Sequence, residues 1–177
     1  MAFLLDTVPG TMVCHVNGHK IIKDLSLSER FEVLSAIALR ARLTVGKNAG
    51  FDIYDSALYP GLTFQVKASN AWQDISTRAK IENHGEVYTF NGADNYEADF
   101  YILFGLKDDM VYPFLFSKNA WKKAGSKTGK RRIVVLKTAR YSRRTKALKE
   151  NRGWNCYIDD WPNGLHRKLH EHQLRLF

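Results

Sequence analysis

The feature that most constrains this chain is a pair of apolar runs joined by a short polar turn. The runs cover residues 100–104 and 111–116, and the turn is centred on Asp108 and Asp109. Short apolar runs bounded by a turn are typical of buried strands, so we predict two consecutive strands here. Residues 62–68 alternate between apolar and polar side chains, which predicts a third strand. The chain must therefore build its core around a β-sheet.

A helix is predicted before these strands. Ser26 is followed three residues later by Glu29, the spacing of a capping box, and apolar side chains then recur at helical intervals to about Leu43. Asn17-Gly18 lies between two β-prone runs and predicts a tight hairpin over residues 11–23. Further strands are expected at residues 51–54 and 132–137, and further helices at residues 74–82 and 165–176.

These elements predict one α+β domain with a central mixed sheet. With 177 residues, 45% of them hydrophobic, the chain can bury one sizeable core. We divide it into an N-terminal hairpin extension (1–24), a core (26–116), a basic segment (117–152) and a C-terminal tail (153–177). No apolar run approaches the roughly 18 residues of a membrane span, the start lacks a cationic leader, and two cysteines cannot form a disulfide framework. A cytoplasmic protein without membrane contact is expected.

The positive charge is concentrated in one part of the chain. The net charge is +9, yet residues 117–152 hold eight Lys and six Arg against a single acid, Glu150, so the remainder is mildly acidic. A strongly basic third in an otherwise acidic protein usually binds a polyanion. Arg can also contact guanine in the major groove. The residues expected to contact DNA are Lys118, Lys122, Lys123, Lys130, Arg131, Arg132, Arg140, Arg143 and Arg144.

The pattern that could carry chemistry lies between residues 29 and 67. Asp52 lies in the predicted strand before residues 62–68, and Gln65 and Lys67 share one face of the latter because strand side chains alternate. A short connection places Asp52 opposite Gln65. The sequence therefore predicts a carboxylate, an amide oxygen and an ammonium group at one end of the sheet.

The order of these residues resembles the PD-(D/E)XK, or restriction-endonuclease-like, nuclease superfamily. That pattern is an acid on the first helix, an Asp on the second strand and (D/E)-X-K on the third, matched here by Glu29, Asp52 and Gln65-Val66-Lys67. Gln65 departs from the usual acid. This departure, and the thirteen-residue step from Asp52, are similar to homing endonucleases encoded in bacterial group I introns.

The resemblance implies a restriction-endonuclease-like core that hydrolyses DNA with metal-activated water. Asp52, the Gln65 side-chain oxygen and the Val66 carbonyl would hold Mg²⁺, with Mn²⁺ as a substitute, and Glu29 would ligate it directly or hold a metal-bound water. Lys67 would orient the attacking water or stabilise charge on the phosphate. Mg²⁺ takes oxygen ligands and lowers the pKa of water, which suits this set. Glu29 is preferred to Glu32 because it lies nearer the apolar stripe of the helix. Asp55 and Asp99 are weaker candidates.

Several interpretations stay open. The resemblance implies an Mg²⁺-dependent, site-specific double-strand endonuclease, most simply a homing endonuclease. A type II restriction endonuclease, a Holliday junction resolvase, a non-catalytic nucleic-acid-binding protein and an RNA-directed factor are the alternatives. Cutting both strands of double-stranded DNA needs two active sites, so a homodimer or homotetramer is expected.

Overall fold

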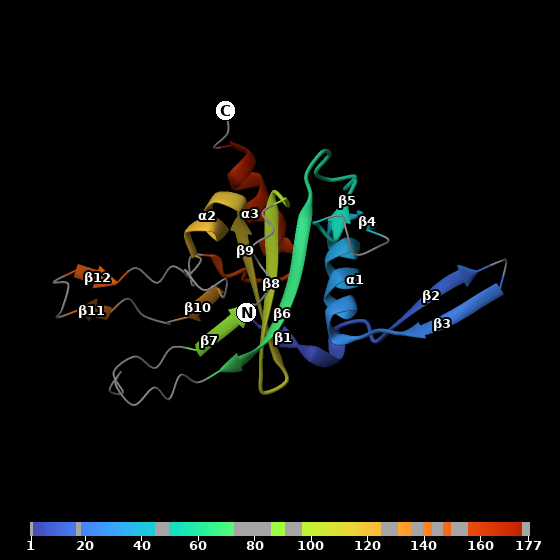
Figure 1. Ribbon diagram of the computed structural model, residues 1–177, viewed down its shortest axis with the longest axis horizontal. Helices are drawn as coiled ribbons and strands as arrows, with labels where there is room; N and C mark the ends of the chain where they lie inside the picture. Colours follow the sequence, from blue (N-terminus) through green and yellow to red (C-terminus); the bar gives the residue numbers. More distant parts are fainter. Residues whose placement is uncertain are drawn as a thin grey trace.

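The computed structural model describes residues 2–16, 19–44, 50–72, 86–90, 97–124, 131–135, 140–142, 147–149 and 156–174. Strands dominate the described chain (Figure 1). The elements are β1 (Phe3–Leu4), η1 (Leu5–Thr7), β2 (Thr11–Val16), β3 (His19–Asp24), α1 (Leu27–Leu39), β4 (Arg42–Leu43), β5 (Ile53–Tyr54), β6 (Phe64–Trp72), β7 (Glu86–Phe90), β8 (Phe100–Lys107), β9 (Met110–Ser117), α2 (Lys118–Ala124), β10 (Arg131–Val135), β11 (Arg140–Ser142), β12 (Ala147–Lys149) and α3 (Asn163–Leu174).

A mixed sheet forms the centre of the molecule, which confirms the predicted fold class. The strands follow the order β1-β9-β8-β6-β5-β4, with β7 paired to β6 and β10 paired to β7. β6 and β8 run parallel, whereas β8 and β9 form an antiparallel pair. Parallel neighbours cannot be joined by a tight turn, so the chain between β6 and β8 has to cross over.

Helices cover both faces of the sheet. Phe31 of α1 stacks on Phe104 of β8 with ring centroids 4.4 Å apart, and Leu165 and Leu169 of α3 belong to the same buried cluster. On the opposite face Trp121 of α2 packs in a second cluster of aromatic and aliphatic side chains. Each residue of β8 from Phe100 to Leu106 is buried, because this strand lies between two covered faces.

The β8–β9 hairpin confirms the two apolar strands predicted from the sequence. Its turn residues, Asp108 and Asp109, have φ of 49° and 58°, a left-handed conformation that Asp tolerates better than most residues. The C-terminal helix is also confirmed, as α3. Its place in the main core shows that the tail packs with the sheet. The helix expected over 74–82 lies outside the described residues.

Helix α1 begins as predicted and ends earlier than predicted. The Ser26 side chain accepts a hydrogen bond from the Glu29 N–H, and the Glu29 carboxylate accepts from the Ser26 N–H, which completes the capping box. The helix ends at Leu39 because Arg40 adopts φ of 49° and its N–H bonds back to the last turn. The apolar pattern that continues to Leu43 belongs to β4.

The predicted N-terminal hairpin is formed by β2 and β3, which pair antiparallel from Thr11 to Asp24. It extends away from the sheet (Figure 1). The Asn17-Gly18 turn itself lies outside the described residues. In the described part of the chain, no helix combines the length and apolar character needed to cross a membrane.

Candidate active site

Asp52 is fixed by its backbone between two segments of the sheet. Its N–H donates to the Phe64 carbonyl at 2.9 Å, and its carbonyl accepts from the Thr44 N–H at 2.8 Å. β5 starts at the next residue and pairs with β6 only at Phe64. The short strand therefore begins directly after Asp52, whose side chain reaches the neighbouring edge of β6.

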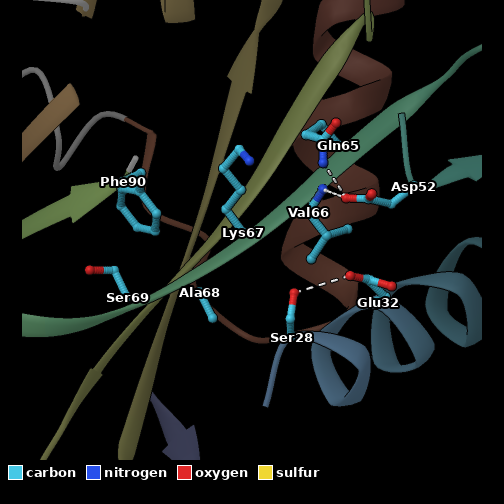
Figure 2. Close-up of a pocket in the computed structure, with 9 residues that line it drawn as sticks. All are labelled: Ser28, Glu32, Asp52, Gln65, Val66, Lys67, Ala68, Ser69 and Phe90. Carbon is cyan, nitrogen blue, oxygen red and sulfur yellow. Dashed lines mark hydrogen bonds between the residues drawn. The ribbon is translucent and has the colours of Figure 1, made fainter. Parts of the chain in front are cut away.

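The Asp52 carboxylate lies directly against the predicted Gln-Val-Lys segment. Its Oδ2 atom accepts a 2.7 Å hydrogen bond from the Val66 N–H and a second, short one from the Gln65 amide nitrogen. Gln65 and Lys67 point to one side of β6 and Val66 to the other, where it is buried (Figure 2). The predicted meeting of Asp52, Gln65 and Lys67 at the edge of the sheet is thus present.

These side chains open into one polar cavity of about 460 Å³. It lies between the edge of β6 and the N-terminal half of α1, and Phe90 of β7 closes it opposite the helix (Figure 2). The sequence did not single out Ser28 of the helix, Ala68 and Ser69 in the distal part of β6, or Phe90 as site residues. The lining residues are Ser28, Glu32, Asp52, Gln65, Val66, Lys67, Ala68, Ser69 and Phe90.

The helix acid that lines the cavity is Glu32, whereas the sequence favoured Glu29 over it. The Glu29 carboxylate bonds to Ser26 and forms an ion pair with Lys23 at the base of the hairpin, and it does not line the cavity. The sequence already held this signal, because a capping box turns its Glu back toward the helix start. Glu32 lies one turn above Ser28, whose hydroxyl donates to it at 3.1 Å.

The two cavity carboxylates are electrostatically coupled. Burial raises the pKa of Asp52, while the Val66 N–H and the Lys67 ammonium oppose that shift. Burial and then the nearby Asp52 charge raise the pKa of Glu32, with opposition from the Ser28 hydroxyl and Lys67. In contrast, Lys23 and Ser26 lower the pKa of Glu29 to about 2. Raised pKa values in a cleft are typical of functional carboxylates, and Glu29 lacks that property.

The donor set suits a hard divalent cation. Burial raises the pKa of both carboxylates and the Asp52 charge raises that of Glu32 further, so a cation between them would favour the charged form of both. No three Asp, Glu, His or Cys side chains form a metal-binding group within the described residues. A cation here would depend on Asp52 and Glu32, supplemented by neutral oxygens. Mg²⁺ accepts such sites, because it commonly keeps water and substrate phosphate among its ligands.

Gln65 does not present its oxygen to this cation site. Its amide nitrogen faces Asp52 and its oxygen points away (Figure 2). A role for the Gln65 oxygen as a ligand beside Asp52 therefore requires the amide to turn over. The Val66 carbonyl needs no such change, because the N–H and C=O of one strand residue point to the same edge and the Val66 N–H points at Asp52.

The two weaker acids have structural partners. Asp99 Oδ2 accepts from both the N–H and the hydroxyl of Thr63, each at 2.9 Å, which ties the start of β8 to β6. Asp55 forms an exposed ion pair with Arg42 at 3.4 Å. Neither residue lines the cavity.

The predicted DNA-contacting residues are only partly described. Lys118 and Lys122 lie on α2, half-buried and exposed respectively. Lys123 lies on α2, Arg131 and Arg132 on β10 and Arg140 on β11, where the description covers the backbone alone. Lys130, Arg143 and Arg144 lie outside the described residues.

Comparison with known proteins finds a likeness among solved structures. No protein-family model matches the chain, and no curated protein matches it either. Among solved structures, the chain is similar to a bacterial homing endonuclease, I-Ssp6803I, with a TM-score of 0.49 and 13% sequence identity. The alignment covers 85% of this chain and 95% of that one.

Proposed function

We propose that this protein is a metal-dependent DNA endonuclease. The observation that carries the proposal is the placement of Asp52, Glu32 and Lys67 around one polar cavity at the open edge of β6. Phosphodiester hydrolysis needs carboxylates to hold a divalent cation and a positive group to stabilise the charge that develops on the phosphate. The cavity offers both.

Each side chain then has a distinct task. Asp52 and Glu32 would hold Mg²⁺, or Mn²⁺ in its place, with the Val66 carbonyl as a neutral ligand. When bound, the cation would polarise the phosphodiester and lower the pKa of water. Lys67 interacts electrostatically with both carboxylates, so its ammonium group would lie where the phosphate approaches them. The Gln65 amide orients the Asp52 carboxylate in the metal-free protein.

A more specific proposal is a homing endonuclease that cuts both strands of double-stranded DNA as a homodimer or homotetramer. Its support is the Gln-Val-Lys sequence in place of an acidic motif, together with the basic segment 117–152. A restriction endonuclease or a junction resolvase would use the same chemistry on other DNA. A second candidate is a non-catalytic nucleic-acid-binding protein that retains the fold. The Gln65 amide, which donates to the Asp52 oxygen, favours this candidate.

Incubation with supercoiled plasmid, in Mg²⁺ and in EDTA, tests the central proposal. We expect nicked and linear DNA only with the metal, and loss of about 10²- to 10³-fold in rate for Lys67→Ala with DNA binding retained. Arg42→Ala is the control, because Arg42 is an exposed cation that pairs with Asp55 and does not line the cavity. Equal cleavage by wild type and Lys67→Ala would remove this site from the reaction.

The choice of DNA separates the specific proposals. A homing endonuclease should cut a plasmid that carries the uninterrupted form of the gene in which its reading frame resides, and should leave the interrupted form intact. Preference for a synthetic four-way junction over both would identify a resolvase.

A further inference from the structure

β6 has one paired edge and one largely open edge. Along the first it pairs with β8 from Phe64 to Asn70. Along the second, β5 reaches only Phe64, and β7 joins β6 only at Ala71 and Trp72. No other strand in the described residues pairs with β6. Unpaired strand edges are usually blocked or covered in native proteins, so an open edge inside a polar cavity calls for a partner.

The direction of the backbone groups along this edge follows from the observed bonds. The Thr63 carbonyl accepts from Phe100 of β8, whereas the Phe64 carbonyl and the Val66 N–H bond to Asp52. Backbone groups of alternate residues point to the same edge of a strand. The Ala68 N–H therefore points to the open edge. It lies two residues beyond the Val66 N–H, which donates to Asp52. Ala68 lines the cavity beside Ser28 of α1 (Figure 2).

We propose that the Ala68 N–H is a substrate contact that binds the phosphate next to the one being cut. This inference rests on the proposed nuclease function. Two residues of β6 separate the Val66 and Ala68 amides by about 6.6–6.8 Å, so the Ala68 N–H lies about that far along the edge from the amide that holds Asp52. Backbone N–H groups are common phosphate ligands and position nucleic acid without regard to sequence.

The alternative occupant is a peptide that adds to the sheet as a further strand. Such a peptide needs a continuous series of backbone groups along the edge. Asp52 already occupies the Val66 N–H, so that series is interrupted at the position where it would begin. The carboxylates of Asp52 and Glu32 beside it favour a ligand that arrives with a cation, as a phosphate does. Nucleic acid is therefore the better fit.

The open edge can be measured without any ligand. In native-state hydrogen exchange of the full chain, the Ala68 amide should exchange faster than the amides of Gln65 and Lys67, which point toward β8. Addition of a thymidine dinucleotide with Ca²⁺ should then shift the Ala68 amide resonance. An Ala68 amide that is as protected as its neighbours, or one that saturating dinucleotide leaves unmoved, would overturn the proposal.

A substitution removes the donor alone. Ala68→Pro deletes the N–H where the edge of the strand is open and proline is tolerated, and Gly10→Ala, which lies outside the cavity, is the control. We expect binding of a 20-base-pair duplex in Ca²⁺ to weaken about tenfold or more for Ala68→Pro, which loses a bond to a charged group, and less than twofold for Gly10→Ala. Equal affinities of a folded Ala68→Pro variant and wild type would refute the contact.

The outcomes also distinguish this inference from the nuclease proposal. If the wild type cuts DNA but the dinucleotide does not shift the Ala68 amide resonance, the nuclease proposal holds and the proposed Ala68 contact is refuted. An amide that responds in a protein that never cuts DNA supports the contact and removes the nuclease. If Ala68→Pro fails to fold, the response of the wild-type Ala68 amide resonance to the dinucleotide tests the contact.

Discussion

Replacing Gln65 with Glu should destabilise the metal-free protein and make its stability dependent on Mg²⁺. In the wild type the Gln65 amide donates to Asp52 Oδ2 within a partly buried site. Gln65→Glu removes a charge-assisted hydrogen bond of about 1.5–3 kcal/mol and places a second carboxylate beside the first. Like charges about 4 Å apart repel by roughly 4 kcal/mol at an effective dielectric constant near 20, and the open cavity screens part of this. We expect a net loss of about 2–4 kcal/mol at pH 8.

Thermal unfolding in EDTA and in MgCl₂ measures both effects. For a chain of this size a loss of about 2–4 kcal/mol corresponds to a drop in Tm of roughly 5–15 °C. Mg²⁺ at about 100 times its Kd should return about 2.7 kcal/mol to the variant. The wild type should respond less, because its amide carries no charge to attract the cation.

A double substitution serves as the control. Gln65→Glu combined with Asp52→Asn restores one carboxylate and one amide with their positions exchanged, so stability in EDTA should recover most of the loss. The metal-free loss should also shrink as the pH falls through the raised pKa of one carboxylate of the Gln65→Glu variant, because protonation removes one of the two like charges. A Gln65→Glu protein as stable as wild type in EDTA, or one that Mg²⁺ leaves unchanged, would refute the described contact and the proposed cation site.

Three further predictions concern other parts of the molecule. The folded-state pKa of Glu29 is lowered to about 2 from 4.5, so its contribution to stability is complete above about pH 4.5 and is lost as the pH falls toward 2. Glu29→Gln should therefore be less stable than wild type at pH 7. In urea unfolding near pH 2 the stabilities of the two proteins should converge. Gly164→Ala would place a methyl group 1.7 Å from a backbone carbonyl oxygen and should cost at least about 1–3 kcal/mol in chemical denaturation, whereas Gly10→Ala meets no atom within 4 Å and should be nearly neutral. Replacing Lys118 and Lys122 together by Gln should make the plot of log binding constant against log salt shallower by about 1.8 for duplex DNA, and an unchanged slope would show that α2 does not contact phosphates.

Local patterns in the sequence predicted most of the elements. The β8–β9 hairpin, α3, β6 and the capping box of α1 each depend on neighbours within a few residues, such as Ser26 and Glu29. The end of α1 was misplaced by four residues, because Leu43 continues the apolar pattern on a strand after Arg40 has turned the chain. Strands as short as β1 and β4 leave too few residues to show a period.

The site was predicted in part. Asp52, Gln65 and Lys67 meet as expected, since a short connection and the alternation of a strand suffice to bring them together. The sequence favoured Glu29 over Glu32 without deciding between them, because a helical wheel treats each side chain as pointing straight out. The structure places Glu32 at the cavity. In the structure the Glu29 side chain turns back to Ser26 and Lys23.

The sequence by itself determined that this chain forms a sheet with a capped helix before it, and that an acid, an amide and an amine lie near one another on consecutive strands. These are properties of short segments, in which periodicity and turn chemistry decide the outcome. Only the tertiary structure decided which helix acid faces the cavity and that β5 begins only at Ile53, leaving the edge of β6 open beyond Phe64. Those features depend on how α1 packs across β6 and on where pairing ends, and contacts between segments distant in the chain set both.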